Sequence, residues 1–493
     1  MLPVFNSSQL KAWDQFTILN EPIKSIDLME RASDCFVKWM AATFDQTKPV
    51  LIFCGNGNNG GDGLAIARKL VHLKYTVNVF CCHISLNDST DFQINLERLM
   101  QSGFDNFLTI QSLDQFLSNN KPGILIDALL GYGVNRPVSD NLIHVLSLYN
   151  GVNAIKISID IPSGLFIDQM SSSPCIWADY TFTFQCPKLS QLIADTGIYC
   201  GTLIIGDIGL DQDFLLSHFT DCNYIVLEDV KNIYKKRNPF AFKNQFGHCL
   251  VIGGSFEMCG ATILSAEAAM RAGAGLVSVS TLEENRNLVI ARLPEVQYVK
   301  PLGITFSKYQ SVLIGPGMGH SKESQMLVEK ILKMQISNLV IDADGLNIIA
   351  QNNLHELIPV NSILTPHIGE FDRLFGKSEN GFERLEKART MAVKYSVYII
   401  LKGKYTAICT PENEVYFNST GNAGLAKAGS GDVLSGILCS FLSQSYSYKN
   451  ACLLGVYLHG LSADLCVDKM AQEVMTATDV ISNLSPAFKF LNE

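Results

Sequence analysis

Residues 420–436 read TGNAGLAKAGSGDVLSG, and this stretch organises our interpretation of the whole chain. It follows a strand-like run at 414–417 and leads into an apolar helix that we expect to begin near Val433. The backbone amides of Gly429, Ser430 and Gly431 are left uncovered at such a turn, and a helix start adds partial positive charge, so a phosphate can bind there. Asp432 would then be suited to deprotonate a hydroxyl that attacks phosphorus. Because so short a motif also matches by chance, a Gly-rich connection with a capping Asp432 is the alternative.

The composition describes a folded protein with a large core. The chain has 493 residues, of which 47% are hydrophobic and 17% charged, and this length predicts two or three domains. The formal net charge is −9, whereas domains that bind nucleic acid usually carry a basic face, so we expect no nucleic-acid partner. One local basic run, 231–237, is interpreted as a solvated linker.

The cysteines and the N-terminus indicate a cytoplasmic protein. The 14 cysteines are scattered, and the one close pair, Cys81 and Cys82, fits neither a zinc site nor a redox motif. We interpret them as buried free thiols in a reducing compartment. Residues 1–8 lack the basic start and long apolar region of a signal peptide, and we expect no apolar run long enough to cross a bilayer.

The first half begins with two predicted helices, at 8–19 and 25–44, followed by a strand at 50–54. The strand runs into a Gly- and Asn-rich loop at 55–63 and then into a helix at 64–73. This is the order of elements in a dinucleotide- or phosphate-binding turn. The bare Gly-x-Gly-x-x-Gly match is weak, and the amides of Asn56, Asn58 and Asn59 together with Asp62 are more informative.

Further apolar strands alternate with helical segments in the first half, which predicts a parallel sheet covered on both faces. The expected strands are 76–82, 124–130, 155–161, 180–184 and 202–208. Polar residues follow several of them: Asp127 precedes Gly131, Asp160 precedes Ser163, and Lys188 lies farther on. Because ligands of open α/β sheets bind at the carboxyl ends of the strands, these loops are expected to form one pocket.

The pattern loosens between about 210 and 246, where we place the domain boundary. A second α/β half follows, with expected strands at 248–252, 276–280, 311–314, 338–343, 362–365, 398–402 and 406–409. The small residues of 260–269 predict a tightly packed helix.

The motifs of the second half occur in a characteristic order. They are Gly253-Gly254-Ser255, 271–277, 315–319, Asp342-Ala343-Asp344, Thr365-Pro366-His367, Lys402-Gly403 and 420–434. Taken singly, His367 is more often structural, and Lys402-Gly403 is compatible with a hairpin turn. In this order, however, they resemble the ribokinase-like fold, and within it the ADP/ATP-dependent NAD(P)H-hydrate dehydratases.

The first half resembles the NAD(P)H-hydrate epimerase family, on the motifs 28–32, 55–63, 127–131, 160–164 and 187–188. Tyr132 departs from it, since a smaller residue is common after Gly131. The resemblance covers nearly the whole chain and implies an N-terminal Rossmann-like three-layer α/β/α epimerase domain at 1–220. A linker at 221–243 and a ribokinase-like α/β dehydratase domain at 244–493 would follow.

The resemblance implies that the second half phosphorylates the C6 hydroxyl of a hydrated nicotinamide cofactor and eliminates phosphate. Asp432 would deprotonate the hydroxyl, with ADP as donor and Mg²⁺ as cofactor; the residues do not exclude ATP. The hydrate would contact Ala261, Gly319, His367 and Asp432. The nucleotide would contact Lys402, Gly403, Lys404, Tyr405, Thr406, Gly429, Ser430 and Gly431.

For the first half, the resemblance implies exchange of the two C6 epimers of NADHX and NADPHX, with Asp160 as the acid–base carboxylate. The hydrate would also contact Asn58, Asn59, Gly60, Gly61, Asp62, Gly131, Tyr132, Gly133, Val134, Asn135, Arg136 and Pro137. Oxygens of Asn59, Asp127 and Ser163 would bind potassium, since hard ligands suit an alkali cation. Capping of strand ends is the alternative role for Asp127 and Asp160.

Two other interpretations remain at this stage. The second half is compatible with a vitamin-precursor kinase acting on a hydroxymethylpyrimidine or a thiazole alcohol. Alternatively, the first half is a non-catalytic binding or scaffold module. Apolar residues near the N-terminal helices favour a homo-oligomer, and we expect no membrane partner.

Overall fold

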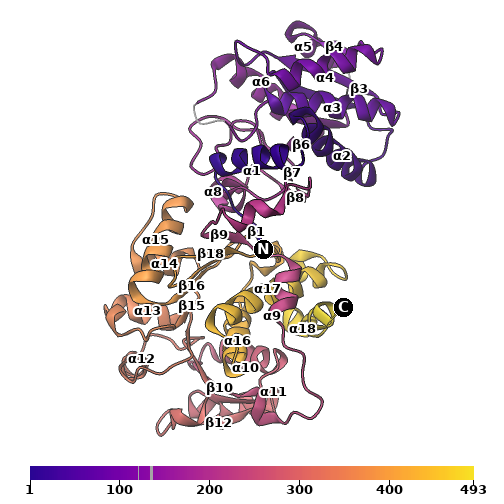
Figure 1. The fold of residues 1–493 in the computed structure, drawn as a ribbon. Helices are drawn as coiled ribbons and strands as arrows, with labels where there is room; N and C mark the ends of the chain where they lie inside the picture. The colour runs from indigo at the N-terminus through magenta and orange to yellow at the C-terminus, as the bar shows by residue number, and fades with distance from the viewer. Residues whose placement is uncertain (120, 134–136, 493) are drawn as a thin grey trace. The chain divides into compact units, whose positions relative to one another are not determined.

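The structure, a computed structural model, describes residues 1–119, 121–133 and 137–492 and divides into two compact units (Figure 1). The N-terminal unit is Pro3–Thr220, and the C-terminal unit joins Asp221–Glu493 with Met1–Leu2. Residues 221–243, for which the sequence predicts a linker, contain the strand β9 (Cys222–Tyr224) and the helix α9 (Leu227–Ile233).

The N-terminal unit is built on a seven-stranded sheet in the order β4-β3-β2-β5-β6-β7-β8. Every neighbouring pair is parallel. The strands are β2 (Val50–Gly55), β3 (Val77–Cys82), β4 (Phe107–Leu108), β5 (Ile124–Ala128), β6 (Ile155–Ile159), β7 (Tyr180–Phe184) and β8 (Thr202–Gly206). Since parallel strands share one carboxyl edge, their following loops meet there.

Helices cover both faces of this sheet, because successive residues of each strand point to opposite sides. Val50 and Ile52 face one core, into which Phe36 and Leu64 pack, whereas Leu51 faces a second core on the other side. The helices of the unit are α1 (Ser7–Asn20), α2 (Ser25–Thr43), α3 (Asn58–His72), α4 (Thr90–Gln101), α5 (Ile110–Asn119), α6 (Asp140–Gly151), α7 (Leu189–Leu192) and α8 (Ala194–Gly197). The predicted three-layer α/β/α arrangement is confirmed.

The Gly-rich stretch after β2 differs from the sequence prediction. We expected a loop as far as Gly63, but α3 begins at Asn58 and includes most of the glycines. Their role is close packing: a Cβ added at Gly60 would lie 1.7 Å from the carbonyl oxygen of Gly55, and one at Gly63 would lie 2.6 Å from the Cβ of Ala128. The missing side chains let the helix start directly against the sheet.

The C-terminal unit contains an eleven-stranded sheet in the order β1-β9-β18-β17-β16-β15-β14-β13-β10-β11-β12. Neighbours from β12 through β16 are parallel, while β17 pairs antiparallel with both β16 and β18. The strands are β1 (Leu2–Pro3), β10 (His248–Ile252), β11 (Leu276–Ser280), β12 (Gln297–Val299), β13 (Ser311–Ile314), β14 (Leu339–Ile341), β15 (Ile363–Leu364), β16 (Tyr398–Leu401), β17 (Ala407–Cys409) and β18 (Val415–Phe417).

Two groups of helices flank this sheet (Figure 1). On one face, α9, α10 (Cys259–Arg271), α11 (Arg286–Arg292), α16 (Ser430–Ser443), α17 (Tyr448–Val467) and α18 (Ala477–Asn492) share a core with Cys249 and Val251. The other helices are α12 (Lys322–Lys333), α13 (Asp344–Gln351), α14 (Ile368–Phe375) and α15 (Gly381–Tyr395). The predicted ribokinase-like α/β class is confirmed, and most strand predictions of both halves were right to within a few residues.

Helix α17 corrects one sequence expectation. We expected no apolar run long enough for a membrane, yet Tyr448–Val467 passes that test by length and composition, the one helix of the described residues to do so. Its most apolar window is 78% buried inside the protein, among the residues of the shared core. Its hydrophobicity is therefore that of a core helix.

Packing of α10 on α16 depends on the absence of a side chain at Gly436. A methyl group there would lie 2.2 Å from the carbonyl oxygen of Ser265. We therefore expect Gly436→Ala to lower the free energy of unfolding of the C-terminal unit by about 1–3 kcal/mol, because the two backbones have to separate.

Chemical denaturation would measure this, with Gly260→Ala on α10 as the control. A Cβ at Gly260 meets nothing within 4 Å, so that variant should be unchanged or slightly more stable through helix propensity. Equal denaturation midpoints for Gly436→Ala and the wild type would contradict this account of the packing.

Candidate functional site

A cavity of about 580 Å³ lies at the carboxyl edge of the N-terminal sheet. Its walls come from α1 and α2, from the start of α3 and from the loops that follow β5, β6 and β7. The predicted contacts that line it are Asn58, Asn59, Asp62, Gly131, Tyr132, Gly133 and Asp160. Gly60 and Gly61 are buried in α3, Pro137 is exposed and is not part of this lining, and Val134, Asn135 and Arg136 lie outside the described residues.

Asp160 lies directly after β6, in the left-handed region with φ +67°. Its Oδ1 is 2.5 Å from Nζ of Lys188, and both side chains are almost fully buried. The same carboxylate oxygen accepts from the backbone N–H of Phe184, and Nζ of Lys188 also donates to Thr183 at 2.6 Å. The ammonium group is fully satisfied, so it neutralises and orients the carboxylate at the cavity wall.

The three predicted potassium ligands lie in one hydrogen-bonded group. The carboxylate of Asp127 accepts from the hydroxyl of Ser163 at 2.5 Å and also from its backbone N–H at 2.8 Å. The side-chain amide of Asn59 reaches the carbonyl oxygen of Leu130 at 2.8 Å, which the Ser163 hydroxyl also approaches, at 3.4 Å. Burial raises the pKa of Asp127, and these hydrogen bonds oppose that rise.

This group is chemically compatible with an alkali cation. The side-chain oxygens of Asn59 and Ser163 and the carbonyl oxygen of Leu130 are hard ligands, close to a buried carboxylate. The described residues contain no cluster of three or more His, Cys, Asp or Glu side chains that could hold a metal ion.

Asp14 is a cavity residue that the sequence did not predict. It lies on α1, and the hydroxyl of Tyr132 donates to its carboxylate at 2.9 Å. Lys188 was noted at a strand end but received no role. An isolated Asp on an amphipathic helix gives no signal of its own, and only the tertiary fold brings it to the loops of the sheet.

The second candidate site gathers around the start of α16. Gly429 precedes the helix with φ +90°, a conformation that favours glycine, and Asp432 lies in the first turn. A Cβ at Gly431 would lie 3.3 Å from Nζ of Lys402, which places the end of β16 against this turn. Burial raises the pKa of Asp432 to about 7, with the charge of Asp342 adding to the rise and Lys402 opposing it.

Lys402 is the centre of a charge cluster. Its Nζ lies 3.3 Å from Asp342 and 3.7 Å from Glu370, two carboxylates that are nearly fully buried. Burial disfavours the ammonium form, but the carboxylates outweigh burial, and the pKa of Lys402 is raised. The sequence predicts neither carboxylate as a site residue, although Asp342 belongs to one of its motifs.

The other predicted contacts of this unit lie in nearby loops. His367 precedes α14, where its Nδ1 accepts from the N–H of Gly369, and its Nε2 is 3.5 Å from Glu370. Gly319 donates its N–H to Asp344 at 2.8 Å. Ala261 lies beside Gly317, since a Cβ there would be 3.1 Å from the Cβ of Ala261.

The residues from Lys402 to Thr406 form the turn between β16 and β17. The hydroxyl of Thr406 donates to the carbonyl oxygen of Gly403 at 3.0 Å, which fixes the turn. Lys404 lies over the ring of Tyr405, which itself packs against Tyr224. Ser430 lies on the other side of the cluster, and its hydroxyl oxygen is 3.3 Å from Nε2 of His459. His459 is buried, and burial lowers its pKa to about 4.

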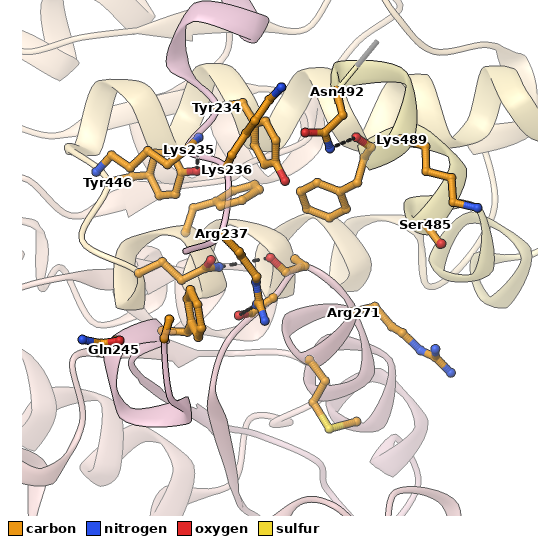
Figure 2. A pocket seen from close by; sticks show the side chains of 18 of the residues that line it. Tyr234, Lys235, Lys236, Arg237, Gln245, Arg271, Tyr446, Ser485, Lys489 and Asn492 are labelled. Atoms are coloured by element: carbon orange, nitrogen blue, oxygen red, sulfur yellow. Dashed lines mark hydrogen bonds between the residues drawn. The ribbon is translucent and has the colours of Figure 1, made fainter. Parts of the chain in front are cut away.

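A second cavity, of about 750 Å³, lies in the C-terminal unit between residues 234–246 and the ends of α10, α16 and α18 (Figure 2). It is basic, with Lys235, Lys236, Arg237, Arg271 and Lys489 in its lining. Arg237 packs over the ring of Phe246, and Lys235 lies over that of Tyr446. Arg271 and Lys489 occupy the last turns of α10 and α18, where cations stabilise the helix ends. These contacts give the basic residues structural roles.

Comparison with known families divides the chain in the same order as the two sites. The profile of the family described as YjeF-related protein N-terminus matches residues 25–190, and that of NAD(P)H-hydrate dehydratase matches residues 249–486.

Two relatives that match over most of their length carry the same name. The chain is 31% identical to the bifunctional NAD(P)H-hydrate repair enzyme of Coxiella burnetii, over 98% of this chain and 99% of that protein. It is 30% identical to the enzyme of the same name from Escherichia coli, over 93% of this chain and 88% of that protein.

Solved structures resemble the C-terminal half. A ribokinase-like superfamily protein of Enterococcus faecalis matches with a TM-score of 0.51 and 28% identity, covering 56% of this chain and 98% of that one. An ADP/ATP-dependent NAD(P)H-hydrate dehydratase of Bacillus subtilis, crystallised with ATP and Mg²⁺, matches with a TM-score of 0.50 and 29% identity. This match covers 55% of this chain and 98% of that one.

The ion pair of Lys188 with Asp160 gives a stability prediction. Lys188→Met removes the cation but leaves the carboxylate buried, which costs about 3–5 kcal/mol where a buried pair is broken. We expect the thermal transition of the N-terminal unit to fall markedly. Lys333→Met is the control, since its pair with Glu329 is exposed and of little energetic value. Equal unfolding temperatures in the two variants would show that Lys188 does not hold Asp160 in place.

Proposed function

The chain belongs to the bifunctional NAD(P)H-hydrate repair enzymes, and from this premise we propose how its residues divide two reactions on one damaged cofactor. It is an enzyme with an epimerase half and a dehydratase half. We assign residues 1–220 to the NAD(P)H-hydrate epimerase, 221–243 to a linker and 244–493 to the dehydratase. The observation that supports this division best is the presence of one charge-paired carboxylate site in each unit.

The substrate carries a hydroxyl at C6 of a reduced nicotinamide ring. Hydroxide leaves poorly, and phosphorylation converts it into a good leaving group, after which elimination of phosphate restores the dihydronicotinamide. In the C-terminal unit, Asp432 would take the proton of the C6 hydroxyl as it attacks the phosphoryl donor. A pKa of about 7 suits a base that works near neutral pH.

The neighbours of Asp432 would bind the two substrates. The amides of Gly429, Ser430 and Gly431 at the start of α16 would hold the transferred phosphoryl group, supported by Lys402. The turn from Lys402 to Thr406 would hold the adenine nucleotide. Ala261, Gly319 and His367 would contact the hydrate from their own loops.

The phosphoryl donor is proposed to be ADP, with AMP and phosphate as products, and Mg²⁺ as the metal. The Bacillus subtilis relative is described as ADP/ATP-dependent and was crystallised with ATP and Mg²⁺. Asp342 and Glu370 lie beside Lys402, and the described residues contain no group of three or more His, Cys, Asp or Glu side chains placed to hold a metal ion. Mg²⁺ would therefore be held mainly by the phosphate oxygens of the nucleotide, together with one or two carboxylates such as that of Asp432. When bound, the metal would neutralise charge on the transferred phosphoryl group.

In the N-terminal unit, Asp160 would act as an acid–base group at C6. Exchange of the two epimers needs reversible loss of the hydroxyl through an iminium, in which the ring nitrogen lends its lone pair. The start of α3 from Asn58 to Asp62 and the loop from Gly131 to Pro137 would hold the hydrate. Potassium bound by Asn59, Asp127 and Ser163 would fix these loops against each other.

Location and assembly belong to the same proposal. A cytoplasmic location is supported by the cysteines, all fourteen of which are free thiols. Self-association is supported by exposed apolar side chains such as Leu19 on α1, at 78% exposure. The vitamin-kinase alternative is set aside, because repair enzymes of two activities match the chain over nearly their full length.

The first experiment follows recovery of NADH by its near-ultraviolet absorbance, starting from a mixture of both NADHX epimers with K⁺ and Mg²⁺. Purified protein receives ADP in one sample and ATP in the other. We expect complete recovery with ADP, because both epimers then reach the dehydratase. Recovery that stops at the share of one epimer would contradict the epimerase assignment, and no recovery with either nucleotide would overturn the proposed function.

Single substitutions should separate the two activities, because each unit has its own acid–base carboxylate. We expect Asp432→Asn to abolish dehydration and leave epimerisation intact, and Asp160→Ala to do the reverse. Dehydration is measured with the pure dehydratable epimer, and epimerisation by chromatographic separation of the two epimers without nucleotide. If either substitution in a folded protein removed both activities, this division would be wrong.

A further inference from the structure

Two carboxyl groups besides the charge-paired Asp160 line the epimerase cavity, those of Asp14 and Asp62, and Asp14 is the one held by Tyr132. Asp14 comes from α1, whereas Asp160 follows β6, so the two groups reach the cavity from different elements. The hydroxyl of Tyr132 donates to Asp14 at 2.9 Å, and no other side-chain hydrogen bond to this carboxyl is found among the described residues. Tyr132 is the residue at which the loop departs from the family pattern.

The surroundings of Asp14 bring its titration close to neutral pH. Burial, with the charge of Asp160 adding to it and the Tyr132 hydrogen bond and Lys188 opposing it, raises the pKa of Asp14 to about 6, so a fraction of the molecules carries the proton near neutral pH. The other charged groups of the cavity wall are Lys11 on the same helix and Asp62 on α3, whose own pKa burial raises well above the usual range. Asp160 differs in having an ammonium group within 2.5 Å.

Exchange of epimers at C6 makes two demands on opposite faces of the nicotinamide ring. On one face a proton has to reach the C6 oxygen while the C–O bond breaks, so that water leaves and the ring nitrogen forms the iminium. On the other face a water molecule has to attack C6 while its proton is removed. A single carboxylate beside one face cannot satisfy both demands at once, whereas two carboxyl groups that share one proton can.

We propose that Asp14 is the second acid–base group of the epimerase, that it contacts the C6 oxygen on the face opposite Asp160, and that Tyr132 positions it. In one direction Asp14 gives its proton to the departing oxygen, and Asp160 takes a proton from the attacking water. In the other direction the roles exchange. One water leaves and one enters, one proton is given and one is taken, and no oxidant or further reactant is needed.

This inference rests on the proposed epimerase activity and deepens it. It also assigns a task to α1. The helix bears the second acid–base group and forms one wall of the cavity through Leu10, Lys11, Asp14, Gln15 and Ile18.

The first test is Asp14→Asn, which keeps the size of the side chain and an acceptor for Tyr132 but carries no exchangeable acid proton of the right pKa. We expect epimerisation in the full-length protein to fall by about 10²- to 10⁴-fold, the usual contribution of a general acid–base group. Dehydration of the pure dehydratable epimer should be unchanged. Asp34→Asn on α2 is the matched control, because that exposed carboxylate pairs with Lys69 on the surface.

The second test is the pH dependence of epimerisation in Tyr132→Phe. In its active form the pair of carboxyl groups holds one proton in either direction, so the rate should fall as the pH rises through the pKa of Asp14. The Tyr132 hydrogen bond lowers that pKa, and its removal should therefore shift the alkaline limb to higher pH. A purely structural Tyr132 would change the rate without moving the limb.

The possible outcomes distinguish a failure of this inference from a failure of the proposed epimerase activity. If the wild type does not interconvert the epimers, the proposed epimerase activity fails. If the wild type is active and Asp14→Asn stays within about threefold of it, the inference is overturned. Should Asp14→Asn fail to fold, Tyr132→Phe decides instead, and an unmoved alkaline limb overturns the inference.

Discussion

A carboxylate buried at the end of a parallel strand needs a cation or several hydrogen-bond donors beside it, and in both halves of this protein a lysine meets that need at the candidate site. Asp160 follows β6 and is held by Lys188, while Asp342 follows β14 and is held by Lys402. The shared edge of a parallel sheet brings such groups together from distant parts of the sequence. In each half a further carboxyl group, Asp14 or Asp432, stands near the pair without a cation of its own, and burial raises its pKa toward neutrality. Each half thus holds one carboxylate paired with a lysine and, near it, a carboxyl group with a raised pKa.

Glycine decides how closely each helix start can approach its sheet. At α3, side chains on Gly60 and Gly63 would collide with the strands, so the Asn- and Gly-rich stretch becomes the first turns of a helix. At α16, Gly429 takes a left-handed conformation and Gly431 leaves room for Lys402. The two stretches look alike in sequence because both remove side chains from a helix start, yet one packs on a strand and the other faces a charge cluster. Similar Gly-rich patterns therefore meet different packing requirements at the two helix starts.

The sequence predicted the alternation of strands and helices because continuous apolar runs such as Leu250 to Ile252 lie in the middle of a sheet covered on both sides. Asp432 and the predicted residues at strand ends came from local motifs. Asp14 did not, because it reaches the cavity only through the packing of α1, and the pairing of Asp160 with Lys188 spans 28 residues. The hydrophobicity of α17 was underestimated because its polar residues interrupt a run that is nonetheless long and buried. Local sequence patterns predict helices and strands, whereas contacts between residues far apart in the sequence become known only from the three-dimensional structure.

The two raised pKa values point to opposite uses of the same physical effect. A base that waits for a hydroxyl has to lose its proton before the reaction, and the charge of Lys402 near Asp432 favours that loss at neutral pH. Asp14 would give a proton in one direction and take one in the other, which a pKa of about 6 allows, and among the described residues its carboxyl accepts one side-chain hydrogen bond, from the hydroxyl of Tyr132. Lys188 lies 2.5 Å from Asp160 and reaches Asp14 only through its longer-range charge, so the two carboxyl groups of the epimerase cavity have different electrostatic surroundings. The position of a single lysine in each half therefore makes neighbouring carboxyl groups unequal.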